Sequence, residues 1–385
     1  MINITKLYCG KSGRSDALRY PLHRDNKPIV VFNCTRRCNL YCRHCYSHIS
    51  GGPAESELTT EQSFRLIDQI AEFGCPVLLF SGGEPLLRED LFGLIGYAGR
   101  KGLRTVLSTN GTLIEESTAA RLAELGVSYV GISLDGPADF HDAFRQVQGS
   151  FAAAVAGIAA CRRAGLPTGI RFTMTADNIR QIPSLFQTAA ELDVRRICFY
   201  HLIRTGRAKD LDRAVPSVSS VREAMDTILA YTEQMTAAGK VDEVLTVGNH
   251  ADGPYLLMRL QRKAPEQAAA AEELLRRAAG NRVGQNIAAV NWAGQVYPDQ
   301  FWRGYSLGNV LERPFADIWQ DQTEPVLKML REKEAYRDPR CQRCRWFELC
   351  GGNFRSLDGC ADVRKWQNEP PCYLTDKEIA FEQEK

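Results

Sequence analysis

The stretch Cys38-Asn-Leu-Tyr-Cys42-Arg-His-Cys45 determines how the fold and the chemistry of this chain are interpreted. Its three cysteines have the spacing C-x3-C-x2-C and directly follow the apolar residues 29–32. Three thiolates can hold three corners of a [4Fe–4S] cube, because cysteine thiolate is the usual ligand of such iron. A structural zinc site takes four protein ligands, whereas a triad leaves one iron of a cube free to bind something else. On spacing alone, part of a zinc site and a set of unligated thiols remain alternatives.

The composition is that of a globular enzyme. Hydrophobic residues make up 44% of the 385 residues, and the formal net charge of +2 gives no indication of a nucleic-acid partner. We find no apolar run of 18 or more residues and no signal-peptide pattern, so we expect a cytoplasmic protein without a membrane span. The 13 cysteines are then expected to be reduced thiols or metal ligands. Cys75, Cys161 and Cys198, which lie in or beside apolar segments, are expected to be buried thiols. Cys34 is expected to be a thiol at a strand end that is not part of the triad.

Short apolar segments alternate with segments of helical period between residues 29 and 240. This alternation predicts βαβ units around a parallel sheet. About six such units predict an α/β fold with a partial (β/α)6 TIM-like barrel, whose site lies at the C-terminal ends of the strands. Thr59 and Thr112 are placed to cap two of the helices. The expected strands are 29–32, 77–80, 105–108, 129–133, 169–174 and 196–200, and the expected helices are 60–73, 88–101, 113–125, 149–165, 179–192 and 217–238.

We divide the chain into three parts. Residues 1–28 lack a strong periodicity and are expected to form an N-terminal extension, and residues 29–240 are expected to form the barrel. Residues 241–385 are expected to form a small C-terminal α+β domain. This last part contains a predicted helix near 264–279, a predicted hairpin with strands 287–290 and 295–297, and a cysteine-rich tail over 341–372.

Short polar segments follow the second, third and fourth predicted strands. Paired glycines expose backbone groups to a ligand, and a neighbouring carboxylate can bind an ammonium group. Small polar side chains suit sugar hydroxyls, although each segment alone is also compatible with a plain turn. Together with an open iron, this set fits S-adenosylmethionine, which carries an amine, a carboxylate and a ribose. The residues are Gly82, Gly83 and Glu84 before Pro85, then Ser108 and Asn110, then Ser133, Asp135 and Arg145.

The C-x3-C-x2-C loop, the Gly-Gly-Glu-Pro turn and the order of the strands resemble the radical S-adenosylmethionine (SAM) superfamily over roughly residues 29–210. The resemblance implies that Cys38, Cys42 and Cys45 hold a [4Fe–4S] cluster. It implies that the reduced cluster cleaves SAM to a 5′-deoxyadenosyl radical. It also places His44 near the adenine and Leu202 among the cofactor contacts. A low-potential electron donor such as flavodoxin or ferredoxin is implied as a partner.

The tail supplies a second set of cysteines, Cys341, Cys344, Cys350 and Cys372. This set resembles the auxiliary-cluster extension of the superfamily, called SPASM or twitch, and implies one fully coordinated [4Fe–4S] cluster. A four-cysteine zinc site is the alternative, and Cys360 is an alternative fourth ligand. Family members with two auxiliary clusters carry further cysteines at the places of Asp299 and Phe354, so we predict one auxiliary cluster in this chain.

Several further stretches resemble the tetrapyrrole-modifying branch of the superfamily, which includes the 12,18-didecarboxysiroheme deacetylases of the alternative haem pathway. The resemblance implies removal of two acetate side chains from this iron-tetrapyrrole, which leaves methyl groups and yields iron-coproporphyrin III. The alternative is the haem d1 type of reaction, in which oxo groups replace propionates. A peptide maturase is a weaker alternative, because residues 1–28 are too short for a peptide-binding domain. The stretches begin at Lys6, Asp16, Thr35, Pro298, Leu307 and Cys350.

A substrate with many carboxylates requires fixed cations, and arginine suits bidentate carboxylate binding. The candidate arginines are Arg19, Arg36, Arg37, Arg204, Arg207, Arg303 and Arg355. The candidates for a proton donor, an iron ligand or another catalytic group are Tyr200, His201, His250, Tyr297 and Asp299, among which the sequence does not choose.

Overall fold

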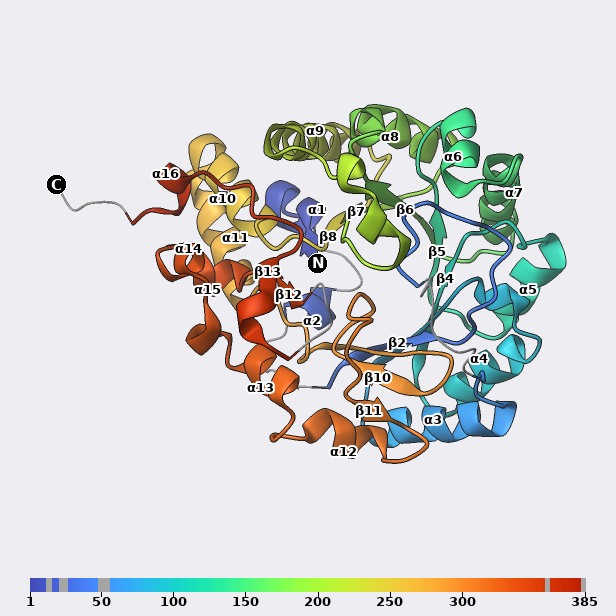
Figure 1. The fold of residues 1–385 in the computed structure, drawn as a ribbon. Helices are drawn as coiled ribbons and strands as arrows, with labels where there is room; N and C mark the ends of the chain where they lie inside the picture. The colour runs from blue at the N-terminus through green and yellow to red at the C-terminus, as the bar shows by residue number, and fades with distance from the viewer. Residues whose placement is uncertain (12–15, 21–26, 48–55, 357–360, 382–385) are drawn as a thin grey trace.

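An eleven-stranded sheet forms the centre of the molecule (Figure 1). The computed structural model describes residues 1–11, 16–20, 27–47, 56–356 and 361–381. The strand order is β1-β8-β7-β6-β5-β4-β3-β2-β9-β10-β11, in which β11 is Gly308–Asn309. The six strands predicted between residues 29 and 200 are all present, with ends shifted by no more than about one residue. They are β2 (Ile29–Asn33), β3 (Val77–Ser81), β4 (Arg104–Thr109), β5 (Val130–Ser133), β6 (Thr168–Met174) and β7 (Arg196–His201).

These strands are parallel, so the loops that follow them leave from the same edge of the sheet. Asn33 at the end of β2 pairs with Ser81 at the end of β3, and Met174 of β6 pairs with His201 of β7. Parallel sheets are covered on both faces, which explains why these segments read as nearly continuous apolar runs. The predicted partial barrel is confirmed. The parallel run also continues beyond six strands, through β8 (Glu243–Val247) beside β7 and β9 (Ile287–Val290) beside β2.

The predicted helices lie on the outside of the curved sheet (Figure 1). Thr59 caps the first of them in a reciprocal capping box with Gln62. The expected cap at Thr112 is wrong. Its hydroxyl donates to the side-chain oxygen of Asn110, and the helix begins later, at Glu116. The helices are α3 (Thr60–Glu72), α4 (Leu91–Arg100), α5 (Glu116–Glu124), α7 (Ser150–Arg163), α8 (Ile182–Glu191) and α9 (Val218–Ala237).

The first residues of the chain complete the sheet. Strand β1 (Ile2–Asn3) pairs antiparallel with β8, and α1 (Ile4–Cys9) follows it with Ile4 and Leu7 buried. Residues 1–11 therefore pack against the barrel, although their sequence shows no strong period. The divisions at residues 28 and 240 remain predictions, and β8 begins just after the second of them.

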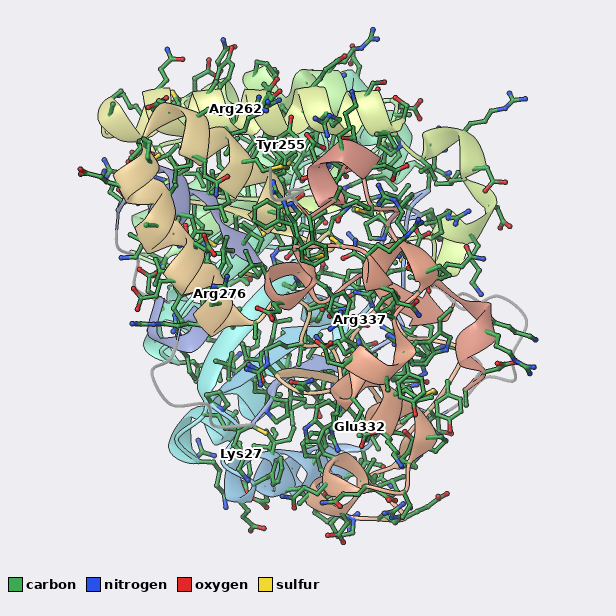
Figure 2. The ribbon with its side chains drawn as sticks, turned by 90° about the vertical axis from the view of Figure 1, so that its left-hand side faces the viewer. Lys27, Tyr255, Arg262, Arg276, Glu332 and Arg337 are labelled. Carbon is green, nitrogen blue, oxygen red and sulfur yellow. The ribbon has the colours of Figure 1, made fainter. Side chains whose placement is uncertain are left out.

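After β8, the C-terminal part continues with two helices, α10 (Asp252–Lys263) and α11 (Pro265–Ala278). The predicted hairpin is confirmed by β9 and β10 (Gln295–Tyr297), which pair antiparallel. Seen from the side, Arg262 and Arg276 lie toward the left of the molecule, and Glu332 and Arg337 lie nearer its middle (Figure 2). An ion pair of 2.8 Å between Arg276 and Glu348 joins α11 to α15 (Phe347–Cys350). In the described ranges, we find no helix with the length and apolar character needed to cross a bilayer.

Candidate functional site

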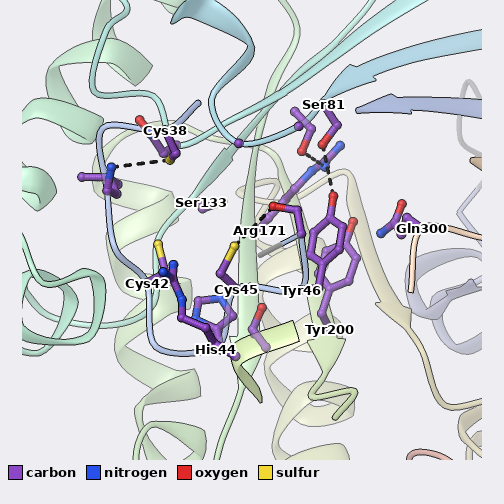
Figure 3. A pocket seen from close by; sticks show the side chains of 18 of the residues that line it. Cys38, Cys42, His44, Cys45, Tyr46, Ser81, Ser133, Arg171, Tyr200 and Gln300 are labelled. Atoms are coloured by element: carbon purple, nitrogen blue, oxygen red, sulfur yellow. Dashed lines mark hydrogen bonds between the residues drawn. The ribbon is translucent and has the colours of Figure 1, made fainter. Parts of the chain in front are cut away.

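One cavity of about 490 Å³ lies where the parallel strands end (Figure 3). Its volume is within the range of sites that bind cofactors and other small molecules. Because consecutive parallel strands end at one edge, residues distant in sequence meet there. The predicted site residues that line it are Cys38, Cys42, His44, Cys45, Gly82, Gly83, Ser108, Asn110, Ser133, Arg145, Tyr200, His201 and Leu202.

The cysteine triad lies on the loop after β2. Backbone hydrogen bonds hold this loop to the end of α6 (Ala138–Arg145): the Tyr41 amide donates to the Arg145 carbonyl and the Arg43 amide to the Phe144 carbonyl, each at 3.1 Å. The thiols of Cys42 and Cys45 point toward the side of the cavity where Cys38 lies (Figure 3). The loop thus presents three half-buried thiols to one space.

Burial raises the pKa of Cys42 to about 11 and also raises the pKa of Cys38. A thiol must lose its proton to bind a metal, so binding of iron at this triad releases protons. Within the described residues, no three His, Cys, Asp or Glu side chains converge closely enough to hold one metal ion. Three thiols that face one space can hold three irons of a cube and leave the fourth iron open, whereas a structural zinc site takes four protein ligands. The donor set fits the [4Fe–4S] group.

Gly82 and Gly83 line the cavity, but the side chain of Glu84 does not. A Cβ atom on Gly82 would lie 2.4 Å from the Thr35 carbonyl oxygen, and one on Gly83 would lie 2.2 Å from that of Arg37. Glycine therefore lets this turn pack against the start of the cysteine loop. The buried Glu84 carboxylate accepts hydrogen bonds from the Thr109 hydroxyl and from the Leu86 and Asn110 amides. It ties the turn to the end of β4 rather than facing a ligand.

Asp135 and Arg145 form a buried ion pair of 2.8 Å. Arg145 lines the cavity, whereas Asp135 lies behind it and is 1% exposed. Burial raises the pKa of the Asp135 carboxyl, but the charge and hydrogen bond of Arg145, together with His44 and His141, outweigh it, and the net pKa is lowered. Asp135 therefore stays ionised and holds Arg145 at the cavity wall.

Among the catalytic candidates, Tyr200 and His201 line the cavity. The Nε2 atom of His201 lies 3.0 Å from Oδ2 of the fully buried Asp252, whose other oxygen accepts a hydrogen bond of 2.7 Å from the Tyr373 hydroxyl. This network fixes the imidazole at the cavity wall.

The structure does not bring His250 or Asp299 to the cavity wall. The His250 amide donates to the side chain of Asn353. Asp299 is buried, accepts the amides of Phe301 and Trp302, and pairs with Arg355. Its carboxylate is committed to these contacts.

The cavity wall is rich in arginine. Arg36, Arg145, Arg171 and Arg207 line it, and none of the described residues that line it is Asp or Glu. Sequence reasoning included Arg36 and Arg207 but missed Arg171, which lies in the middle of β6. A signal in the sequence is Gly131 within the neighbouring strand, since a glycine inside a strand often marks a close approach. In the structure a Cβ atom at Gly131 would lie 2.2 Å from Arg171 Nε. The other candidates lie elsewhere: Arg19 pairs with Glu243, Arg204 with Glu369 and Arg355 with Asp299, and neither Arg37 nor Arg303 is part of this wall.

The four tail cysteines, Cys341, Cys344, Cys350 and Cys372, line one small cavity in the C-terminal part. Burial, aided by the charge of Asp338, raises the pKa of Cys341 to about 12. The alternative ligand Cys360 lies outside the described residues. Cys75, Cys161 and Cys198 are buried, as expected. Cys34, directly after the end of β2, is buried as well.

The barrel carries three thiols at the C-terminal ends of its parallel strands, and the C-terminal extension carries four more. This arrangement defines an iron–sulfur enzyme built on a partial barrel. Comparisons with known proteins agree. Residues 32–189 match the family model described as the radical SAM superfamily, and residues 282–345 match one described as an iron–sulfur cluster-binding domain. The solved structure of native anSMEcpe with bound AdoMet has a TM-score of 0.68, covers 91% of this chain and 96% of its own, and is 18% identical, which supports the fold.

Two relatives cover nearly the whole chain. The Fe-coproporphyrin III synthase of Methanosarcina barkeri is 47% identical over 99% of both chains. The pre-heme d1 synthase of Dinoroseobacter shibae is 38% identical over 91% of this chain and 87% of its own. This chain belongs to the radical SAM superfamily. It is a radical SAM enzyme whose cofactors are SAM, a [4Fe–4S] cluster and an auxiliary iron–sulfur cluster.

Proposed function

We propose that this enzyme removes two acetate side chains from 12,18-didecarboxysiroheme and so forms iron-coproporphyrin III. The observation that carries this proposal is the wall of the cavity that holds the cysteine triad, which four arginines and no described carboxylate line. Arg145 is paired with Asp135 behind the wall, which leaves Arg36, Arg171 and Arg207 for the carboxylates of a substrate. Such a wall suits a substrate with many carboxylates, since guanidinium groups bind them in bidentate fashion. The 47% identity with a synthase of the same product supports the choice of substrate.

The chain's own residues have separable roles in this proposal. Cys38, Cys42 and Cys45 would hold the cluster with one open iron. When bound, SAM and the reduced cluster supply the one-electron chemistry that activates an inert side chain of the substrate. The residues that would orient SAM are His44, Gly82, Gly83, Ser108, Asn110, Ser133, Arg145 and Leu202, with Glu84 and Asp135 holding two of these positions from behind.

His201 and Tyr200 are the groups that can exchange a proton with the substrate. Both line the cavity, and the hydrogen bond between Nε2 of His201 and the Asp252 carboxylate fixes which nitrogen of His201 faces inward. His250 and Asp299 are assigned no direct role, because neither lies at the wall.

In the C-terminal part, Cys341, Cys344, Cys350 and Cys372 would hold a single auxiliary [4Fe–4S] cluster. The ion pair between Asp299 and Arg355 supports one cluster rather than two, because it occupies the place of one further ligand. We also propose a low-potential donor such as flavodoxin or ferredoxin and a cytoplasmic location, where such thiols stay reduced. The divisions at residues 28 and 240 are proposed as the domain limits.

The competing function is the haem d1 type of reaction, which the 38% identity with a pre-heme d1 synthase keeps open. The test is anaerobic incubation of the reconstituted, reduced protein with SAM and 12,18-didecarboxysiroheme, followed by mass spectrometry. Loss of two acetate substituents with release of 5′-deoxyadenosine is expected. Products in which oxo groups replace propionates would favour the competing function, and no cleavage of SAM would contradict both.

A further inference from the structure

Beside the main cavity lies a second, much smaller cavity that is rich in hydrogen-bond donors. Its volume is about 10 Å³, and it shares Ile203 and Phe301 with the wall of the main cavity. Four basic residues contribute to its lining: Arg204, Lys209, Arg303 and Arg355. None of the described residues that line it is acidic.

Arg303 has no counterion in this cavity. All three of its guanidinium nitrogens are buried and lack a hydrogen-bond partner in the described part of the chain. The guanidinium lies near the rings of Tyr46 and Tyr297, with distances of 5.4 and 5.7 Å to the ring centroids. Aromatic rings stabilise a cation but accept none of its in-plane hydrogen bonds. A buried cation without an acceptor is costly, so this arrangement is incomplete without an anion.

Two further donors point to the same conclusion. The indole Nε1 of Trp302, a residue that is 2% exposed, and Nε of Arg355 are also buried and unpartnered within the described residues. By contrast, the charge of Arg355 is balanced by Asp299, and that of Arg204 by Glu369 at 2.9 Å. The unbalanced buried charge is therefore that of Arg303.

We propose that Arg303, with the Trp302 indole N–H and Nε of Arg355, forms a carboxylate-binding pocket that holds one propionate of the tetrapyrrole substrate. The identity of this ligand rests on the function proposed above. A planar guanidinium matches the two oxygens of a carboxylate. At about 10 Å³ the cavity is the size of a single water molecule, so a carboxylate would enter it only with movement of the lining side chains, while the ring stays in the main cavity.

The pocket also fixes the orientation of the substrate. Tyr46 directly follows the cluster ligand Cys45, lines the main cavity and stacks against Arg303. A carboxylate anchored on Arg303 therefore sets which edge of the macrocycle faces the cysteine triad. The propionate held by Arg303 would therefore also fix where the reacting acetates lie.

Binding measurements test this pocket directly. Arg303→Met keeps the length of the side chain and removes its charge and donors, and Arg303→Lys restores the charge without the planar fork. Reconstituted protein is titrated anaerobically with iron-coproporphyrin III and with its tetramethyl ester, which has the same ring and no carboxylates. Arg162→Gln is the control, because Arg162 is exposed and pairs with Asp193 on the surface.

We expect Arg303→Met to weaken binding of iron-coproporphyrin III by about 10- to 100-fold, as expected for loss of a charged hydrogen-bonded pair, and to leave binding of the ester unchanged. The affinity of Arg303→Lys for iron-coproporphyrin III should lie between that of the wild type and that of Arg303→Met. The thermal midpoint of Arg303→Met should be equal to or higher than that of the wild type, because a buried unpaired charge is removed.

Equal loss of affinity for both porphyrins, wild-type affinity in Arg303→Met, or a wild-type protein that binds neither porphyrin would each overturn the proposed pocket. The proposed function fails independently. If the wild type forms no iron-coproporphyrin III but Arg303→Met still loses affinity only for the carboxylate form, the pocket stands and the function does not. If the wild type forms that product and Arg303→Met binds it normally, the function stands and the pocket does not.

Discussion

At the scale of single residues, position in the fold separates cysteines that look equivalent in sequence. Cys34 and Cys38 are four residues apart, yet Cys34 is fully buried and its thiol donates to the Ser81 carbonyl at 3.3 Å. Burial raises the pKa of Cys34 to about 12, which keeps this thiol protonated. Cys38, by contrast, faces the cavity. The same residue type therefore serves packing in one place and ligation in the other.

This difference gives a prediction with a matched control. Cys38→Ala should reduce the iron content of the reconstituted protein from about eight to about four atoms per chain, since only the auxiliary [4Fe–4S] cluster remains. Cys34→Ala should retain about eight. Iron and sulfide analysis under anaerobic conditions measures both. A full iron complement in Cys38→Ala would show that this cysteine is not a ligand.

His141 gives a prediction about pH. It is fully buried, its Nδ1 accepts the Asp135 amide at 3.2 Å, and burial, with the nearby charge of Arg145, lowers its pKa to about 4. Below pH 6.5 the unfolded chain binds this proton and the folded protein does not, so stability falls as the pH drops from about 6.5 to about 4. The slope for one such group is at most about 1.4 kcal/mol per pH unit.

Denaturant unfolding of reconstituted wild type and His141→Asn over this pH range measures the effect. The Asn side-chain oxygen can replace the acceptor and does not titrate, so the variant should lose part of the pH dependence and keep most of its stability at pH 7. Identical slopes in the two proteins would mean that His141 does not titrate in this way.

At the scale of elements, the sequence predicts the strands and helices that local patterns determine. The strands of the barrel are apolar runs bounded by turn residues, and all six were predicted together with the hairpin of β9 and β10. Helix α6 was missed because it is short and its N-terminus has no side-chain cap. Helix α10 was missed because Gly253-Pro254 in its first turn looks like a turn, although proline is tolerated there.

Some site residues were predicted from the sequence and others were not, for a physical reason. Motif residues such as Cys38 and Gly82 lie on loops whose place is set by parallel strands, so topology alone brings them together. The position of Arg171 at the wall, the unpartnered indole of Trp302 and the hydrogen bonds of Glu84 depend on where side chains point and which partners lie near them. Those properties arise from packing between segments distant in sequence, which no local pattern reports.

The close contact between Gly131 of β5 and Arg171 of β6 gives a prediction at this scale. Gly131→Ala should push the Arg171 side chain away from its place at the cavity wall, because the new Cβ atom would lie 2.2 Å from Nε. We expect affinity for iron-coproporphyrin III to fall by about tenfold, the effect of losing one charged contact. Gly93→Ala on α4 is the control, since nothing lies within 4 Å of its added Cβ atom. Equal affinity in the two variants would contradict a substrate contact for Arg171.

At the scale of the whole molecule, the ends of the chain are joined to the barrel. Residues 1–11 pack along β8, and Tyr373 from the C-terminal part reaches Asp252, which in turn holds His201 at the cavity. The cavity wall also includes Trp292, Gln300 and Phe301, which come from the segments after β9 and β10. The C-terminal part therefore completes the site as well as carrying the second set of cysteines.

Removal of residues 2–9 should destabilise the protein, because Ile2, Ile4 and Leu7 are buried. Burial of each such side chain is worth about 1.5–3 kcal/mol, so a loss of several kcal/mol is expected together with exposure of the β8 edge. Thermal unfolding and size-exclusion chromatography would show a lower midpoint and association. An unchanged midpoint would mean that this segment contributes little to the fold.

We expect the arginine-lined cavity to bind a polycarboxylate macrocycle beside the cysteine triad. An anaerobic crystal structure of the reconstituted enzyme with SAM and iron-coproporphyrin III tests it most directly. We expect the ring edge to face Cys38, Cys42 and Cys45, with carboxylates on Arg171, Arg207 and Arg303. A macrocycle bound outside this cavity, or one inside it whose carboxylates contact only solvent, would show that these arginines do not bind the substrate.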